Sequence, residues 1–300
     1  MGTIVVMGPP GRLGNRLHLF ASVMAFSLRR GHRVVNFGFL RYAHFFTGTS
    51  GDVLTCAYPS GKPIGSRPGP LGRFLRLLSR AATRITIPFL RLSRKRVLDL
   101  GQDAAFIGAN MDRVEAEAAA RNVVILRGFS FRDMAGVEAH GDRIREHFRL
   151  VEPHASAVKD RARALRRGSV LVGVHVRKGD YRRHQGGRFD YSVAVYAGLV
   201  RRTESLFQDS VSFAFVSDDA DTARSVARAC PGLDVGFGTG HPVEDMYLLA
   251  ACDYIIGPPS TFSKWASFYG ERPLYLMTDP AADFTLADFE VYGDLRPWRF

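Results

Sequence analysis

Short β-branched runs alternate with segments of helical apolar spacing along this chain. The first strand is predicted at Thr3–Met7, a helix follows at Leu13–Leu28 and is closed by Gly31, and a second strand is predicted at Arg33–Phe37. This order is typical of a parallel sheet covered by helices. The same rhythm predicts further strands at Val123–Leu126, Val170–Val176, Val211–Val216, Leu233–Phe237 and Tyr254–Ile256, and helices at residues 152–167, Asp221–Ala229, Val243–Ala251 and after Ser260.

The length of the chain favours two domains. Its 300 residues, 46% of them hydrophobic, supply two cores of about 150 residues each. We place the boundary at about residue 160, within the predicted helix 152–167, so that residues 1–160 and 161–300 form separate domains. The simplest architecture is two Rossmann-like, doubly wound α/β domains that face a cleft.

Cysteine usage and the amino terminus indicate the compartment. The 3 cysteines are widely spaced and lack a CxxC pair, which argues against a disulfide framework or a zinc site. The start MGTIVVMGPPGRLGN resembles a buried strand rather than a signal peptide, and no apolar run is long enough to span a membrane. We therefore expect a cytoplasmic protein.

The excess positive charge is concentrated in one segment. Between Asp52 and Asp99 there is no acidic residue, whereas residues 62–96 carry 10 lysines and arginines. A helix is predicted at Leu71–Ile85, with an apolar face opposite four arginines: Arg73, Arg76, Arg80 and Arg84. A cationic amphipathic helix is typical of peripheral binding to anionic membranes, and the alternative is a packed helix with a solvated basic face. No nucleic-acid-binding motif accompanies the charge, so we expect no nucleic-acid partner.

The strongest candidate site follows the most apolar strand, in the run VLVGVHVRKGDY. His175 and Arg177 are two residues apart and leave the same face as the strand ends, and Asp180 follows a turn at Gly179. Ligands of open α/β sheets bind beyond the carboxyl ends of the strands, and a guanidinium there suits a diphosphate. The alternative is an Arg–Asp ion pair that only holds the loop.

Two further strand ends carry polar residues. After the strand at Tyr254–Ile256, Ser260 or Thr261 is predicted to cap a helix whose amino terminus favours phosphate, or which is an ordinary capped helix. In the run FVSDDAD, Asp219 and Asp221 match the metal-binding DxD pattern. Alternatively, Asp221 begins a helix, and Asp218 or Asp219 accepts hydrogen bonds from a nucleoside.

The loop after the first strand resembles a dehydrogenase dinucleotide loop, with Gly8, Gly11 and Gly14 as GxxGxxG. No acidic residue occurs between Gly14 and Asp52, so the carboxylate expected for the ribose is missing. We therefore do not predict a nicotinamide cofactor.

Four segments together resemble the bacterial α-1,2-fucosyltransferases. HVRKGDY resembles their HxRRGDY motif, and more loosely the HxRxG motif of α-1,6- and protein O-fucosyltransferases. GRLGNR at Gly11–Arg16 resembles GRLGNQ, and VSDD at Val216–Asp219 resembles their SDD segment. The stretch Asp245–Phe268 resembles their D-x-x-L-M-S-x-C … N-S-S-F-S-W-W region, although Lys264 replaces the first Trp.

The resemblance implies a two-domain GT-B fold and inverting, metal-free transfer of fucose from GDP-fucose to a glycan hydroxyl, α-1,2 to galactose. It implies no cofactor besides this donor. It places Arg177 at the β-phosphate, with His175 on the donor or supporting Arg177. Asp218 and Asp219 would face the guanosine. The phosphates would meet Ser260, Thr261 and Phe262, and from the other domain Arg12, Gly14 and Asn15.

The expected mechanism has the acceptor hydroxyl attacking as GDP leaves. We name Asp180 as the base, with His184 and Asp190 behind it. The basic segment at residues 71–96 would hold the enzyme at the inner membrane face, where a lipid-linked acceptor glycan would lie. Two alternatives stay open: a metal-dependent glycosyltransferase using Asp219 and Asp221, and a non-catalytic nucleotide-binding protein docked on membrane or RNA.

Overall fold

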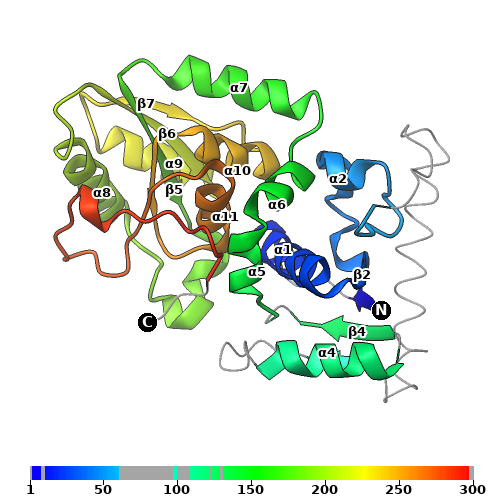
Figure 1. Cartoon of the computed structure of the whole chain (residues 1–300). Coiled ribbons are helices and arrows are strands. Elements are labelled where there is room, and N and C mark those ends of the chain that lie inside the picture. The colour runs from blue at the N-terminus through cyan, green and yellow to red at the C-terminus, as the bar shows by residue number, and fades with distance from the viewer. Residues whose placement is uncertain are drawn as a thin grey trace. The chain divides into compact units, whose positions relative to one another are not determined.

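The computed structural model describes residues 2–7, 11–60, 97–99, 109–121, 123–128 and 131–296. The chain divides into two compact units (Figure 1). The first holds residues up to Val151 together with Asp294 to Arg296, and the second holds Glu152–Gly293. The boundary predicted at about residue 160 therefore lies inside a helix of the second unit, α7 (His154–Leu165). This helix belongs there because it packs on α10 (Pro242–Ala251). The basic residues 62–96, with the helix predicted at Leu71–Ile85, lie outside the described residues.

The first unit has a four-stranded parallel sheet in the order β2-β1-β4-β3. Its strands are β1 (Thr3–Val6), β2 (Arg33–Asn36), β3 (Val97–Asp99) and β4 (Val123–Arg127). Its helices are α1 (Leu13–Arg30), α2 (Thr47–Ser50), α4 (Ala109–Arg121), α5 (Met134–Ala139) and α6 (Gly141–His147).

Helix α1 is the central helix of the first unit. Its residues are buried almost without interruption from Leu13 to Ser27, and Phe20 is fully buried in a cluster of aromatic rings. It ends where Gly31 adopts a left-handed conformation (φ 71°) and donates its N–H to the carbonyl of Ser27 at 2.8 Å. The strand–helix–strand start predicted from the sequence is therefore confirmed.

The second unit has a five-stranded parallel sheet in the order β7-β6-β5-β8-β9. Its strands are β5 (Val170–Val176), β6 (Val211–Ser217), β7 (Asp234–Phe237), β8 (Tyr254–Gly257) and β9 (Leu274–Leu276). Besides α7 and α10, its helices are α8 (Val193–Glu204), α9 (Ala220–Arg228) and α11 (Thr261–Gly270). Strand β5 has the predicted bounds, and β6, β7 and β8 differ from theirs by one residue.

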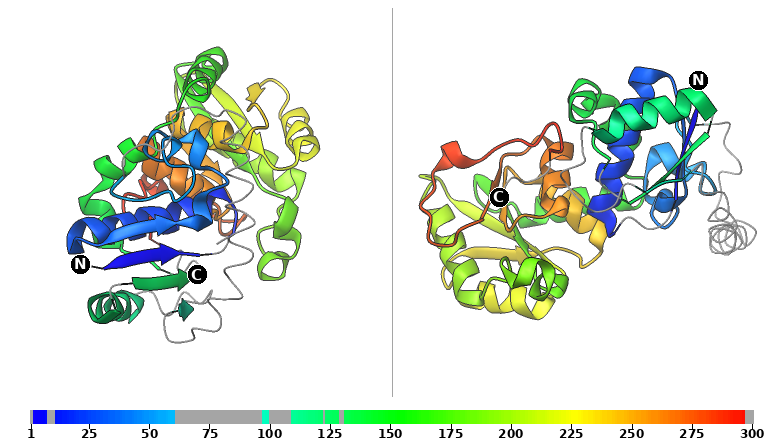
Figure 2. Two further views of the ribbon diagram at one scale, coloured as in Figure 1. Left: turned by 90° about the vertical axis from the view of Figure 1, so that its right-hand side faces the viewer. Right: turned by 90° about the horizontal axis from the view of Figure 1, so that it is seen from below.

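Both faces of this sheet are covered, as in a doubly wound fold. Val172 and Val174 point into a core shared with α8 and α9, and Leu171 faces a second core shared with α7, α10 and α11. Figure 2 shows these layers from two further directions. The period-two alternation along β5 explains why a nearly continuous apolar run forms a central strand. Among the described residues, no helix is long and apolar enough to cross a membrane.

Candidate functional site

The topology of the second unit brings two predicted sites together. Strands β5 and β8 are neighbours in the sheet. Strands β6 and β7 lie on one side of this pair and β9 lies on the other, so the carboxyl ends of β5 and β8 form the switch point where such sheets bind ligands. The ring of His175, at the end of β5, stacks on the ring of Phe262 in α11 at 5.0 Å. A Cβ at Gly257 would lie 2.7 Å from the carbonyl oxygen of His175, so a glycine is needed where β8 ends.

Arg177 lies in the middle of this edge with its side chain 12% exposed. Its guanidinium pairs with Asp180 at 2.5 Å and with Asp218 at 2.8 Å, and it lies 5.3 Å from the ring of Tyr181. Within the described part of the chain, its Nε is buried and has no hydrogen-bond partner. The ion pair anticipated as the alternative interpretation is therefore present, and it includes a second carboxylate.

Tyr196 fixes the backbone of Arg177. The phenol of this fully buried α8 residue accepts a hydrogen bond from Arg177 N at 2.9 Å and donates one to Arg177 O at 3.1 Å. Desolvation by burial raises the pKa of Tyr196 well above its usual range. Tyr181 fastens the loop after β5 to the loop after β8, because its hydroxyl donates to the carbonyl of Pro259. Sequence reasoning missed both tyrosines, although Ser192 and the apolar spacing behind it were a usable signal for α8.

His175 is a neutral side chain in this structure. It is 2% exposed, and burial together with the nearby Arg177 lowers its pKa to about 3. Its Nδ1 is one of the buried atoms that lack a hydrogen-bond partner within the described residues. An uncharged imidazole packed on Phe262 can shape the site and exchange a hydrogen bond with a ligand, but it adds no positive charge.

The amino terminus of α11 is built as predicted. Ser260 is the N-cap, and its hydroxyl accepts a hydrogen bond from Phe262 N at 3.2 Å. Ser260 is buried, whereas Thr261 and Phe262 are half-buried. The first turn of the helix presents backbone N–H groups and a partial positive charge at the edge that Arg177 occupies.

The acidic residues after β6 make hydrogen bonds and an ion pair with neighbouring residues of the site. Asp218 accepts a hydrogen bond from Lys178 N at 3.0 Å, in addition to its pairing with Arg177. Asp219 is the N-cap of α9, and its Oδ1 accepts from the N–H groups of Asp221 and Thr222, each at 3.1 Å. The hydrogen bond from Thr222 is the main cause that lowers the pKa of Asp219.

Asp221 and Asp180 differ in what they contact. Asp221 is 90% exposed and pairs with Arg224 at 2.5 Å, so it begins a helix as one alternative predicted. Asp180 is half-exposed and contacts Arg177. Of the two groups placed behind Asp180, Asp190 pairs with Lys178.

Arg12, Gly14 and Asn15 lie at the start of α1, in the first unit. Arg12 is the exposed N-cap residue, Gly14 is buried and Asn15 is half-buried. Arg16 stands where the GRLGNQ motif that this segment resembles has glutamine. It donates to the carbonyls of Gly11 and Gly38, both at 2.8 Å, and so fastens this loop to the segment after β2.

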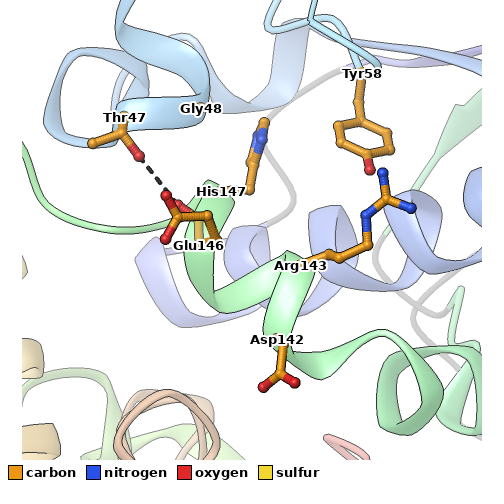
Figure 3. Close-up of a pocket in the computed structure, with 7 residues that line it drawn as sticks. All are labelled: Thr47, Gly48, Tyr58, Asp142, Arg143, Glu146 and His147. Atoms are coloured by element: carbon orange, nitrogen blue, oxygen red, sulfur yellow. Dashed lines mark hydrogen bonds between the residues drawn. The ribbon is translucent and has the colours of Figure 1, made fainter.

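The first unit also contains a pocket that sequence reasoning did not predict. It has a volume of about 610 Å³ and lies between α2 and α6 (Figure 3). The guanidinium of Arg143 lies beside the phenol of Tyr58, while Asp142 points away from them. Burial lowers the pKa of His147 to about 4, so this ring is neutral. The pocket is lined by Thr47, Gly48, Tyr58, Asp142, Arg143, Glu146 and His147.

Known proteins resemble the chain at two levels. In sequence, it is 34% identical over 170 residues to galactoside alpha-(1,2)-fucosyltransferase 1 of Saimiri sciureus, covering 52% of this chain and 44% of that protein. It is 32% identical over 145 residues to galactoside 2-alpha-L-fucosyltransferase Sec1 of Mus musculus, covering 42% of this chain and 39% of that protein. The chain thus spans less than half the length of these relatives.

In structure, the neighbours match nearly the whole chain. FUT1 of Arabidopsis thaliana, solved as a mutant with GDP, superposes with a TM-score of 0.59 at 14% identity, covering 92% of this chain and 70% of that one. Fucosyltransferase NodZ from Bradyrhizobium superposes with a TM-score of 0.57 at 17% identity, covering 94% and 97%. These likenesses confirm the predicted fold class, two Rossmann-like domains of the GT-B type.

The family follows from the sequence match. Residues 139–289, half of the chain, match glycosyl transferase family 11. This range contains β5 to β9 and therefore the whole edge around Arg177. The chain belongs to glycosyl transferase family 11.

Proposed function

We propose that this protein transfers L-fucose from GDP-fucose to a hydroxyl of a galactoside, forming an α-1,2 linkage. The observation that carries the proposal is the position of Arg177, a nearly buried guanidinium at the switch point, beside the amino terminus of α11. Relatives named as α-1,2-fucosyltransferases and a NodZ structure soaked with GDP-fucose support the donor and the linkage.

The charges around Arg177 define the first step. With Asp180 and Asp218 the guanidinium forms a cluster whose net charge is negative, which repels a diphosphate. Asp180 is 50% exposed and Asp218 is 21% exposed, so Asp180 is the partner that water stabilises more readily when it is displaced. Donor binding therefore exchanges Asp180 for the β-phosphate, while Asp218 keeps the arginine in position.

This exchange also supplies a base. The fucosyl–phosphate bond breaks as positive charge grows on the sugar and negative charge grows on GDP. Arg177 and the N–H groups of α11 stabilise the diphosphate without reorganising. Asp180, released from its ion pair, accepts the proton of the attacking hydroxyl. Attack opposite the leaving group inverts the anomeric carbon.

The chemistry requires no metal in this proposal, because Arg177 and α11 supply the positive field. The contacts of the two aspartates support this, since the carboxylate of Asp219 caps α9 and that of Asp221 pairs with Arg224. Arg12, Gly14 and Asn15 would complete the phosphate site from the first unit. We also propose a lipid-linked acceptor glycan, and a cytoplasmic enzyme that the basic residues 71–96 hold at the inner membrane face.

A donor and product screen tests the proposal. GDP-fucose, GDP-mannose, a UDP-sugar and NADPH are compared by thermal shift, and transfer to lactose is followed with product linkage and anomeric configuration read by NMR. We expect stabilisation by GDP and GDP-fucose, and an α-1,2-linked product from GDP-fucose. Saturable GDP binding without turnover on any galactoside would indicate a non-catalytic nucleotide-binding protein.

A further inference from the structure

Two histidines and a glutamate meet in the second unit, beyond the carboxyl end of β7. His154 is the first residue of α7, His241 is the N-cap of α10, and Glu244 lies in the first turn of α10. Nδ1 of His154 lies 2.7 Å from Oε1 of Glu244, and Nδ1 of His241 lies 4.0 Å from the same oxygen. The two imidazole rings stack at 5.3 Å with an angle of 15° between them. The side chains are 24%, 35% and 14% exposed, in the order His154, His241 and Glu244.

Helix α7 holds His154 at this position. Val158 and Arg161, four and seven residues further along, lie on the same face of the helix. Val158 is buried, and Arg161 donates its Nε–H to the carbonyl of Phe237 at 2.7 Å, at the end of β7. The face that carries His154 is therefore fixed against the β7–α10 connection.

The loop before α10 holds the other two groups. Asp245, which is 4% exposed, accepts hydrogen bonds from Thr239 N at 2.7 Å and Gly240 N at 3.3 Å. A Cβ at Gly238 would lie 2.3 Å from this carboxylate, so the tight loop requires glycine there. Thr239 Oγ1 also donates to Oε2 of Glu244 at 2.9 Å. Because Oε2 is anchored in this way, Oε1 is left to face both histidines.

We propose that His154, His241 and Glu244 form a binding site for Zn²⁺. Imidazole nitrogen and carboxylate oxygen are ligands that zinc accepts, and bonds of about 2.0–2.1 Å in a tetrahedron place ligand atoms about 3.3 Å apart. The observed separations from Glu244 Oε1, 2.7 Å and 4.0 Å, lie on either side of that value. The ligand atoms of the three residues all lie within 4.8 Å of one another, so binding requires them to draw together and the two stacked rings to turn toward one cation. On Nδ1 of His241, the cation takes the place of the long hydrogen bond of 3.4 Å that this atom accepts from Glu244 N.

The site is structural in this proposal. It joins the first turn of α7, which starts just after the boundary between the units, to the connection that leaves β7. It contains none of the residues proposed to hold the donor. Zinc therefore stabilises the fold and takes no part in transfer, and the inference stands whether or not the proposed reaction is correct.

The test uses the full chain without a histidine tag, stripped of metal. We expect one equivalent of zinc to bind, the melting temperature to rise with zinc but not with magnesium, and Co²⁺ to give the visible absorption of a low-coordinate nitrogen–oxygen site. Melting curves with GDP are recorded on the same samples, so that a failure of donor binding is seen separately.

Conservative variants separate ligation from folding. His241→Asn keeps an N-cap side chain, and Glu244→Gln keeps an acceptor for Thr239. Each should weaken zinc binding by at least about 100-fold while the metal-free melting temperature stays close to that of the wild type. His44→Ala removes an exposed histidine of the first unit and serves as the matched control. The proposal is overturned if the wild-type chain takes up no zinc, or if both variants bind it as tightly as the control.

Discussion

Tyr196→Phe is the substitution that best separates positioning of Arg177 from general stability. The phenol makes two hydrogen bonds to the backbone of Arg177, at 2.9 and 3.1 Å, and the side chain is fully buried. Phenylalanine keeps the ring and removes both bonds. An unsatisfied buried backbone group costs about 1–3 kcal/mol, so we expect the free energy of unfolding to fall by about that amount.

The same change should lower the rate of transfer. The backbone of Arg177 loses its anchor, and a displaced catalytic group costs about 10-fold or more in kcat. Tyr191→Phe is the matched control, because this buried tyrosine donates one hydrogen bond, at 2.7 Å, to the carbonyl of Met277. We expect the control to lose about 1 kcal/mol of stability and to keep its kcat.

The assays are urea unfolding followed by circular dichroism, and initial rates with GDP-fucose and lactose. Equal kcat values for the two variants would show that the hydroxyl of Tyr196 does not position Arg177. An unfolding free energy of Tyr196→Phe equal to that of the wild type would refute the hydrogen-bond argument itself.

The pH dependence of stability has a defined sign. The pKa of His147 is lowered from 6.5 to about 4 by burial, so its contribution is complete above the unfolded pKa and is lost as the pH falls toward 4. Between about pH 8 and about pH 5.5 this group alone should cost about 1.4 kcal/mol of unfolding free energy in urea titrations, and the buried His175 adds a similar loss. The variant His147→Phe should remove the first share only. Asp221→Asn should keep full activity and EDTA should leave initial rates unchanged below the melting transition; activity that vanishes and returns with Mn²⁺ would contradict this. Glutamine at the four arginines of the 71–85 segment should release the protein from anionic liposomes at low salt without changing GDP affinity, as flotation measures.

The parts of the site that could be predicted are the residues that directly follow a strand in the sequence. His175 and Arg177 follow a strand whose apolar run marks it as central, and Ser260 follows a short strand and two prolines. Parallel order then requires the carboxyl ends of these strands to lie at one edge. Residue type and position alone were enough to find both halves of this edge.

The partners of these residues could not be predicted, because folding brings them from distant positions. Tyr196 lies 19 residues from Arg177. Asp218, which accepts a hydrogen bond from Lys178 N, lies 40 residues from that lysine. His154 and Glu244 are 90 residues apart, and no spacing rule links them. The pocket lined by Tyr58 and Arg143 likewise joins segments that share no motif.

One departure from the family pattern also became intelligible only in three dimensions. Lys264, which stands where the family has tryptophan, is 2% exposed, and its Nζ lies 4.3 Å from the centre of the Tyr292 ring. The buried ammonium thus packs over an aromatic face, and Trp265 next to it is fully buried. Lys264 and Trp265 both belong to the buried face of α11.

The account depends most on Arg177, and fucose transfer by variants of this residue tests it most directly. Wild type, Arg177→Lys and Arg177→Ala are compared with GDP-fucose and lactose, with melting temperatures as the control for folding. Lysine keeps the charge but not the planar fork, so we expect both variants to lose on the order of 10²–10³ in rate while remaining folded. Near-normal transfer by Arg177→Lys would contradict the central claim that this guanidinium grips the departing diphosphate.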